Sequence, residues 1–248
     1  MNDRRKHRGK MSGGKPAGEK RGRVTKAAPK SAENQRTMTR KVKTAKGRKL
    51  SSKLWLERQI NDPFVARARA EGWRSRAAFK LQELDDRFGL IKPGMLIADL
   101  GSAPGGWSQV AMRRGAGKVV GIDILPVEPI EGTDQIEMDF NDPQASVAVM
   151  ELLGAKPELV MSDLAANTTG HQNTDHLRTI NLVEEAYAFA IENLAPGGAF
   201  VAKVFQGGTE SGLLNDLKTR FKTARHFKPE SSRKGSPEIY LVATGFKG

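Results

Sequence analysis

The sequence predicts a doubly wound α/β fold with a Rossmann-like, mostly parallel seven-stranded sheet, and three observations favour it. Short segments rich in Val, Ile, Leu and Phe recur along the chain and alternate with longer segments of helical periodicity. Most of the short segments are apolar throughout, as expected of parallel strands that are buried on both faces. The first of them runs into a glycine-rich turn and then a helix, a layout typical of cofactor-binding α/β domains.

Two helices are predicted before the sheet. The first is short and covers residues 53–60. In the second, over 75–89, apolar residues recur at spacings of four, three and four, which is the pattern of one buried helix face. We expect Ser75 to cap this helix and Gly89 to end it. The residues of the apolar face are Ala77, Leu81, Leu84 and Phe88.

Strands and helices then alternate to the end of the chain. A less regular strand at 223–229 is expected to supply antiparallel pairing beside the last strand. The other strands are predicted at 95–101, 118–123, 135–140, 158–164, 199–205 and 238–246. Helices are predicted between them at 105–115, 143–154, 175–194 and 209–221.

Charge divides the chain into two parts. Residues 1–53 hold 19 lysines and arginines against three acidic residues, a net charge of +16. Because this arm has almost no large apolar side chains, we expect it to be disordered and to contact RNA. A mitochondrial transit peptide or a merely solubilising tail are the alternatives. Residues 54–248 carry 22 basic and 25 acidic side chains, a net charge of −3, and are predicted to form one domain.

Composition excludes several classes of protein and site. The sequence has no cysteine, which excludes disulfides, thiolate metal sites and a cysteine nucleophile. No apolar run approaches the roughly 20 residues that a membrane span requires, and we expect a cytoplasmic protein. His171 and His176 lack a set of partner ligands, so we predict no metal.

The turn after the first strand, residues 99–107, is predicted to bind a cofactor. Gly101, Gly105 and Gly106 let the backbone approach a ligand closely. Their spacing differs from the GxGxxG of a dinucleotide-binding turn, and Pro104 lacks an N–H to offer a phosphate. A phosphate ligand is therefore disfavoured at this turn.

Acidic residues stand at the ends of three successive strands, namely Asp99, Asp123 and Asp139. Asp123 is placed to accept hydrogen bonds from ribose hydroxyls, and Asp139 is placed for an adenine edge. An acidic site suits a cofactor that is cationic at one end, which points to S-adenosylmethionine rather than NAD. The alternative is that these aspartates only cap turns.

Four further polar residues suggest the chemistry: Lys80, Asp163, Lys203 and Glu238. The chain lacks the Asn/Asp-Pro-Pro-aromatic loop of amino-methyltransferases and the cysteine of pyrimidine C5-methyltransferases. A lysine can position a ribose hydroxyl or, as a neutral amine, remove its proton, and the sequence leaves both roles open for Lys203. A lone lysine is usually a solvated surface charge. Lys203 is the exception, because burying a charged ammonium in the apolar segment 199–205 costs free energy unless it has a function.

These segments resemble the FtsJ family of ribose 2′-O-methyltransferases over about residues 54–248. The resemblance rests on SRAAFKLQELD, DLGSAPGGWSQ, MSDLAAN, LAPGGAFVAKVFQG and SSRKGSPEIYLVATG, which are highly specific as a set. It departs from the family at Ser102, a small change, and in the long basic arm. By the resemblance, the catalytic positions are Lys80, Asp163, Lys203 and Glu238, and the cofactor positions are Gly105, Trp107, Asp123, Asp139 and Asp163.

The resemblance implies S-adenosylmethionine-dependent methylation of a uridine ribose in 23S-type large-subunit rRNA, within the assembled large ribosomal subunit. Alternatives are a 2′-O-methyltransferase of the same family that acts on tRNA or mRNA caps, and a ribosome-assembly factor that only binds RNA. No sequence feature indicates an obligate protein partner. Two basic segments are expected to bind phosphates beside the catalytic residues, unless they are merely solvated. They are formed by Arg67, Arg69, Arg74 and Arg76, and by residues 231–234.

Overall fold

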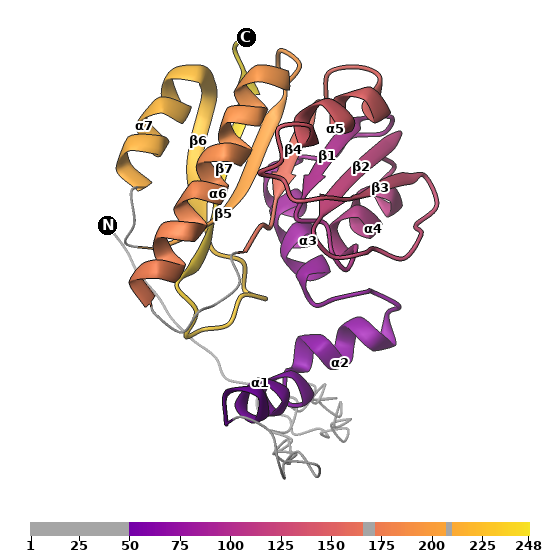
Figure 1. Cartoon of the computed structure of the whole chain (residues 1–248), viewed down its shortest axis with the longest axis vertical. Helices are drawn as coiled ribbons and strands as arrows, with labels where there is room; N and C mark the ends of the chain where they lie inside the picture. The colour runs from indigo at the N-terminus through magenta and orange to yellow at the C-terminus, as the bar shows by residue number, and fades with distance from the viewer. Residues whose placement is uncertain (1–49, 166–171, 207–209) are drawn as a thin grey trace, which may run out of the picture. The chain divides into compact units, whose positions relative to one another are not determined.

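The computed structural model describes residues 50–165, 172–206 and 210–248 (Figure 1). These residues belong to one compact unit, Arg40–Gly248. The arm is predicted to be disordered. Its residues 1–49 lie outside the described ranges, so its disorder stays a prediction. Helix α1 begins at Leu50, so the last four residues of the predicted arm, 50–53, are helical.

A seven-stranded sheet with the order β3-β2-β1-β4-β5-β7-β6 forms the centre of the domain. Strands β1 to β5 are parallel, and β7 runs antiparallel between β5 and β6. The mostly parallel sheet and the antiparallel pairing near its end are thus confirmed. The strands are β1 Leu96–Leu100, β2 Lys118–Asp123, β3 Thr133–Glu137, β4 Leu159–Ser162, β5 Ala199–Phe205, β6 Phe221–Phe227 and β7 Glu238–Phe246.

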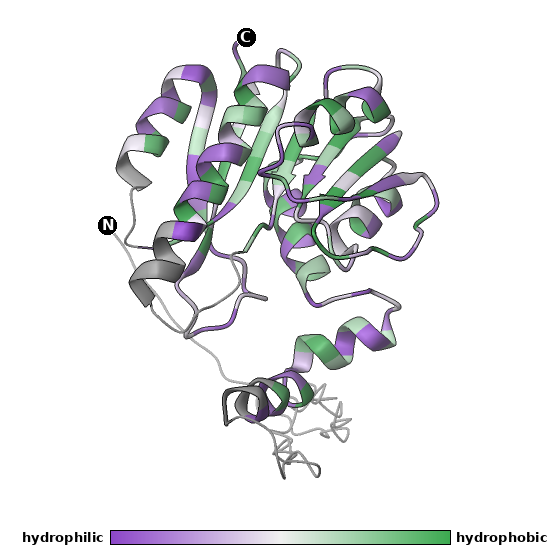
Figure 2. Ribbon diagram, viewed as in Figure 1, coloured by the Kyte–Doolittle hydropathy of each residue, from purple (hydrophilic) through white to green (hydrophobic). Residues whose placement is uncertain are grey.

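Helices cover both faces of the sheet, which confirms the doubly wound architecture (Figure 1). One apolar core joins the sheet to α5, α6 and α7, and the other joins it to α3 and α4. Figure 2 shows the hydrophobic colour concentrated on the strands, as burial on both faces requires. The helices are α1 Leu50–Ile60, α2 Pro63–Ala70, α3 Ala77–Phe88, α4 Gly106–Arg113, α5 Ala145–Leu153, α6 Gln172–Asn193 and α7 Glu210–Arg220.

Two local predictions need correction. Helix α3 begins at Ala77, after Arg76 rather than Ser75; the Ser75 hydroxyl still accepts a hydrogen bond from the Ala77 N–H at 3.2 Å. Gly89 ends the helix in the left-handed conformation, as predicted. Strand β3 ends at Glu137, two residues before Asp139, because β3 is an edge strand and its pairing with β2 stops there. In the described part of the chain, no helix is both long and apolar enough to cross a membrane.

Asp99 is a fully buried carboxyl in the middle of the sheet. One of its oxygens accepts a hydrogen bond from the Ser108 hydroxyl at 2.6 Å, and the other has no partner among the described residues. Burial raises the pKa of Asp99 to about 7, more than the Ser108 hydrogen bond lowers it, and the charge of Asp163 adds to the increase. Asp99 is therefore a structural carboxyl that is partly protonated near neutral pH.

The Asp99→Asn variant tests this buried carboxyl. A pKa of about 7 lies above the ordinary carboxyl value of ~3.9, so Asp99 stabilises the fold below about pH 4. That contribution is lost as the pH rises through 7. The unfolding free energy of Asp99→Asn relative to the unsubstituted protein should therefore increase by roughly 2 to 3 kcal/mol between pH 5 and pH 8. Urea unfolding at both pH values measures it, and a difference that does not change with pH would contradict the assignment.

Gly101 provides a second test, because it sits where β1 meets the segment after β4. Its φ is +80°, and a Cβ there would lie 2.9 Å from the backbone of Leu164. Gly101→Ala should lower the unfolding free energy by about 2 to 4 kcal/mol, through left-handed strain and this clash. Gly89→Ala is the matched control, since its φ is +61° but nothing lies within 4 Å of the added Cβ. Equal losses for the two variants in urea unfolding would show that the close approach to Leu164 is unimportant.

Candidate active site

The register of three strands brings the predicted catalytic residues together. Leu100 of β1 pairs with Ser162 of β4, so Asp163 follows at the carboxyl end of the parallel strands. Ser162 in turn pairs with Ala202 of β5, which places Lys203 one residue further on, beside Asp163. Because the carboxyl ends of parallel strands share one edge of the sheet, the two side chains meet there.

Lys203 and Asp163 form a buried ion pair. The Lys203 Nζ lies 3.1 Å from Asp163 Oδ1 and donates a hydrogen bond to the Asp163 carbonyl oxygen at 2.6 Å. Burial by itself raises the pKa of Asp163, but the charges of Lys203 and Lys80 outweigh it and hold that pKa below its ordinary value. Asp163 is therefore ionised at neutral pH.

Tyr240 forms a hydrogen bond to this ion pair. It was not identified from the sequence. It lies directly opposite Lys203 in the β5–β7 pairing, and its hydroxyl donates to Asp163 Oδ1 at 2.9 Å. Burial, followed by the charge of Asp163, raises the pKa of Tyr240 well above its ordinary value, so the phenol remains a donor. Tyr240 is two residues after Glu238, and residues two apart on a strand share a face. This alternation is the sequence signal that could have placed Tyr240 beside Glu238 in the site.

Lys80 and Glu238 form a second ion pair next to the first. Their Nζ and Oε1 atoms are 2.7 Å apart, and the Ser232 hydroxyl donates to the same oxygen at 3.0 Å. The Lys80 Nζ also lies 5.6 Å from the centre of the Tyr240 ring, so it links the two pairs. The structure thus brings all four predicted catalytic residues into one cluster.

Asp123, Asp139 and Asp163 line a cavity of about 570 Å³ at the same edge of the sheet. Both carboxylate oxygens of Asp123 accept backbone N–H groups, from Ala103 at 3.0 Å and from Leu125 at 2.9 Å. Asp139 accepts from the Asn141 N–H at 3.0 Å. Asp123 and Asp139 therefore cap turns and also face the cavity. The lining further includes Ile124, Leu125, Arg178 and Glu185, none of which was selected from the sequence.

Gly105 and Trp107 do not line this cavity. Gly105 precedes α4 with a φ of +99°, and its N–H donates to the Ser102 carbonyl at 2.6 Å. The Trp107 side chain is buried in the core, where its indole N–H donates to the Ala77 carbonyl at 2.9 Å. Its ring lies 5.7 Å from the Tyr240 ring, measured between centroids. Both residues shape the turn and the base of the site.

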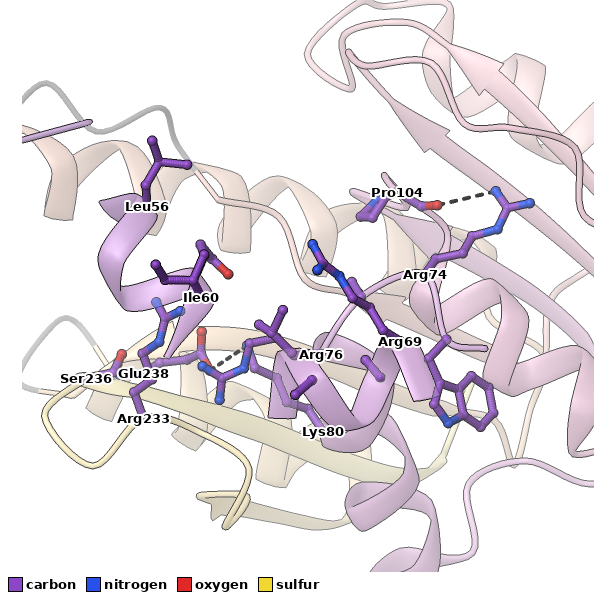
Figure 3. A pocket seen from close by; sticks show the side chains of 16 residues that line it. Leu56, Ile60, Arg69, Arg74, Arg76, Lys80, Pro104, Arg233, Ser236 and Glu238 are labelled. Atoms are coloured by element: carbon purple, nitrogen blue, oxygen red, sulfur yellow. Dashed lines mark hydrogen bonds and ion pairs between the residues drawn. The ribbon is translucent and has the colours of Figure 1, made fainter. Parts of the chain in front are cut away.

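The arginines of the two predicted basic segments differ in whether they pair with a carboxylate. Arg76 and Arg233 both pair with Asp62, at 2.5 and 3.2 Å. Arg67 pairs with Glu71 at 2.6 Å and stacks on the Phe79 ring. Arg74 and Arg69 have no carboxylate partner within the described ranges, and both line a further cavity beside Lys80 (Figure 3). The basic segments are thus in part structural.

Where side chains are described, no group of three His, Asp or Glu residues is arranged to hold a metal ion. His171 and the side chain of His176 lie outside the described residues.

Comparisons with known proteins agree with this geometry. A family model described as FtsJ-like methyltransferase matches residues 73–246. The ribosomal RNA large subunit methyltransferase E of Granulibacter bethesdensis is 60% identical over 206 residues, covering 83% of this chain and 90% of that protein. The protein of the same name from Gluconobacter oxydans is 50% identical over 253 residues, covering 97% and 94%.

One solved structure agrees as well. A crystal structure of a ribosomal RNA methyltransferase from Plasmodium falciparum is 30% identical, with a TM-score of 0.64. It covers 71% of this chain and 100% of its own. Since the family model extends over more than half of the chain and contains the whole cluster from Lys80 to Glu238, the chain belongs to the FtsJ-like methyltransferase family.

Proposed function

We propose that this methyltransferase uses S-adenosylmethionine to methylate the 2′-hydroxyl of a uridine in large-subunit rRNA. The observation that carries the proposal is the cluster of two lysine–carboxylate pairs next to an acid-lined cavity. The names of the relatives from Granulibacter and Gluconobacter support rRNA of the large subunit as the substrate. The uridine and the 2′-oxygen come from the family resemblance and from the residue types.

The cavity of about 570 Å³ has the side chains that S-adenosylmethionine needs. Asp123 and Asp139 offer carboxylate oxygens to hydroxyl and amino groups, and the exposed side chains of Ile124 and Leu125 offer apolar surface to an adenine ring. Asp163, ionised at neutral pH, favours a cationic sulfonium. When bound, S-adenosylmethionine supplies an electrophilic methyl group.

Lys203 is the residue proposed to hold the acceptor hydroxyl. Two of its contacts go to Asp163, which leaves a third N–H of the ammonium to donate to the acceptor oxygen. A hydroxyl held in line with its electrophile becomes more reactive, because the entropy of orienting the two groups is lost before the reaction. The ion pair with Asp163 supports an orienting role for Lys203, while action as a base would first require loss of its proton.

Lys80, Glu238 and Ser232 hold the second side of the acceptor site. Glu238 accepts from both Lys80 and Ser232, so its carboxylate has a fixed position. Ser232 belongs to the β6–β7 loop, and Glu83 of α3 accepts the backbone N–H of Ser231 at 2.9 Å. The helix before the sheet and the loop before β7 are therefore joined at the proposed acceptor site.

The Asp123→Ala variant tests the cofactor. Loss of the carboxylate should weaken S-adenosylmethionine binding by about 1 to 3 kcal/mol, because hydroxyl donors of the ligand lose their acceptor. Isothermal calorimetry of the purified protein measures the affinity. Asp134→Ala, which removes a carboxylate of β3 outside the cavity, should bind like the unsubstituted protein. An unchanged affinity for Asp123→Ala would remove Asp123 from the cofactor site.

The second test addresses the reaction itself. Ribose methylation is mapped on large-subunit rRNA from cells that lack the protein and from cells complemented with the unsubstituted chain, Lys203→Ala or Lys222→Ala. We expect one uridine to lose its 2′-O-methyl group without the protein. The unsubstituted chain and Lys222→Ala, which changes an exposed lysine of β6, should restore it, and Lys203→Ala should not.

Measurements on the purified protein distinguish an effect on the chemical step from an effect on cofactor binding. The single-turnover rate of Lys203→Ala on large ribosomal subunits should fall by about 10²- to 10⁴-fold, with cofactor affinity close to that of the unsubstituted protein. Normal methylation by Lys203→Ala would refute its role. Loss of methylation on tRNA, with large-subunit rRNA unaffected, would favour the tRNA alternative. An unaltered methylation map would favour a binding factor.

A further inference from the structure

A cavity of about 950 Å³ lies beside the Lys80–Glu238 pair, which forms part of its lining (Figure 3). Leu56 and Ile60 of α1 and several residues of α2 line it as well. The family model begins at residue 73, so both of these helices precede the matched region. A part of the chain outside the family match thus builds one wall of a cavity next to the proposed acceptor site.

Helix α2 is held firmly in this wall by Asp62. One Asp62 oxygen accepts the Phe64 N–H at 3.0 Å and caps the helix, while the other accepts from Arg76 and pairs with Arg233. The Phe64 ring also packs on Phe79 of α3, with centroids 5.6 Å apart. These contacts connect α2 to α3 and to the β6–β7 loop.

The cavity is positively charged. Five cationic side chains line it against the single carboxylate of Glu238. Asp62 pairs with two of them, Arg76 and Arg233, and its single negative charge offsets one of their two positive charges. Arg74 donates to the carbonyl oxygens of Glu128 and Pro129, and no carboxylate of the described segments pairs with it. The five are Arg69, Arg74, Arg76, Lys80 and Arg233.

Arg69 is the cation that is most available to a ligand. Its side chain is exposed, and no ion pair or hydrogen bond ties it to another described residue. In the view of Figure 3 its guanidinium lies between Ile60 and Arg74. The cavity therefore offers a guanidinium that is unpaired within the described residues, next to the apolar surface of Leu56, Ile60 and Val65.

From this arrangement we infer that the cavity binds a single-stranded RNA segment, and that Arg69 contacts a phosphate flanking the nucleotide to be methylated. The inference rests on the proposed function and extends it to residues 50–70. Positive charge recognises phosphates, and apolar surface suits the face of a base. Asp163 lines the cofactor cavity while Lys80 and Glu238 line this one, so the catalytic cluster lies between the two ligands.

The test compares full-length Arg69→Ala with the unsubstituted protein on large ribosomal subunits from cells that lack the protein. Loss of one phosphate contact should raise KM for the subunit severalfold and leave kcat and the affinity for S-adenosylmethionine unchanged. The slope of log affinity against log salt should become shallower by about 0.7 to 0.9, the value of one phosphate contact. Arg69→Lys, which keeps the charge, should retain the slope.

Arg87→Ala is the matched control, because Arg87 is an exposed arginine in the last turn of α3 that does not line the cavity. It should reproduce the unsubstituted KM and salt slope. If Arg69→Ala does the same while the unsubstituted protein methylates its subunit, the cavity inference is wrong and the proposed function stands. If the unsubstituted protein methylates no RNA, the proposed function itself fails. A decrease in kcat with KM unchanged would also contradict a phosphate contact.

Discussion

The buried ion pair between Lys203 and Asp163 is the constraint on which the site depends. An isolated ammonium in the apolar strand β5 or an isolated carboxylate after β4 would be costly, and each compensates the other. Tyr240 adds a hydrogen bond to the same carboxylate from the neighbouring antiparallel strand. Because three strands contribute to one compensated group, their relative register is coupled to the electrostatics of the site.

The same cluster separates two environments that the proposed reaction requires. On one side, carboxylates and exposed apolar side chains line the cavity suited to a cationic, adenosine-containing cofactor. On the other side, arginines and the apolar residues of α1 and α2 line the cavity suited to RNA. Lys80 interacts with Glu238 and lies over the Tyr240 ring, so it connects both sides. This division gives each cavity the charge opposite to that of its proposed ligand.

The arginines of this domain have two different roles, although the residue type is the same. Arg76 and Arg233 converge on Asp62 and hold three segments together, whereas Arg69 has no such partner among the described residues. A guanidinium satisfied by a buried carboxylate is a structural link, and one that faces a cavity can bind an anion. Net charge alone therefore says little about which basic residues are available to RNA.

The sequence by itself determined the fold class, the order of the elements apart from helix α2, and four of the residues that meet in the cluster, namely Lys80, Asp163, Lys203 and Glu238. Apolar strands, helical periodicity and the FtsJ-like segments are all local in the chain, so they could be read without coordinates. Asp123, Asp139 and Asp163 were likewise predicted for the cavity that they line.

Only the tertiary structure decided which groups pair. Tyr240 acts through the β5–β7 register, Asp62 joins residues more than 100 positions apart, and Trp107 lies in the core rather than in the cavity. Such partners are separated by long stretches of chain, and no local pattern encodes their distance. They depend on strand register and on the packing of helices against the sheet, which are set by the whole domain at once.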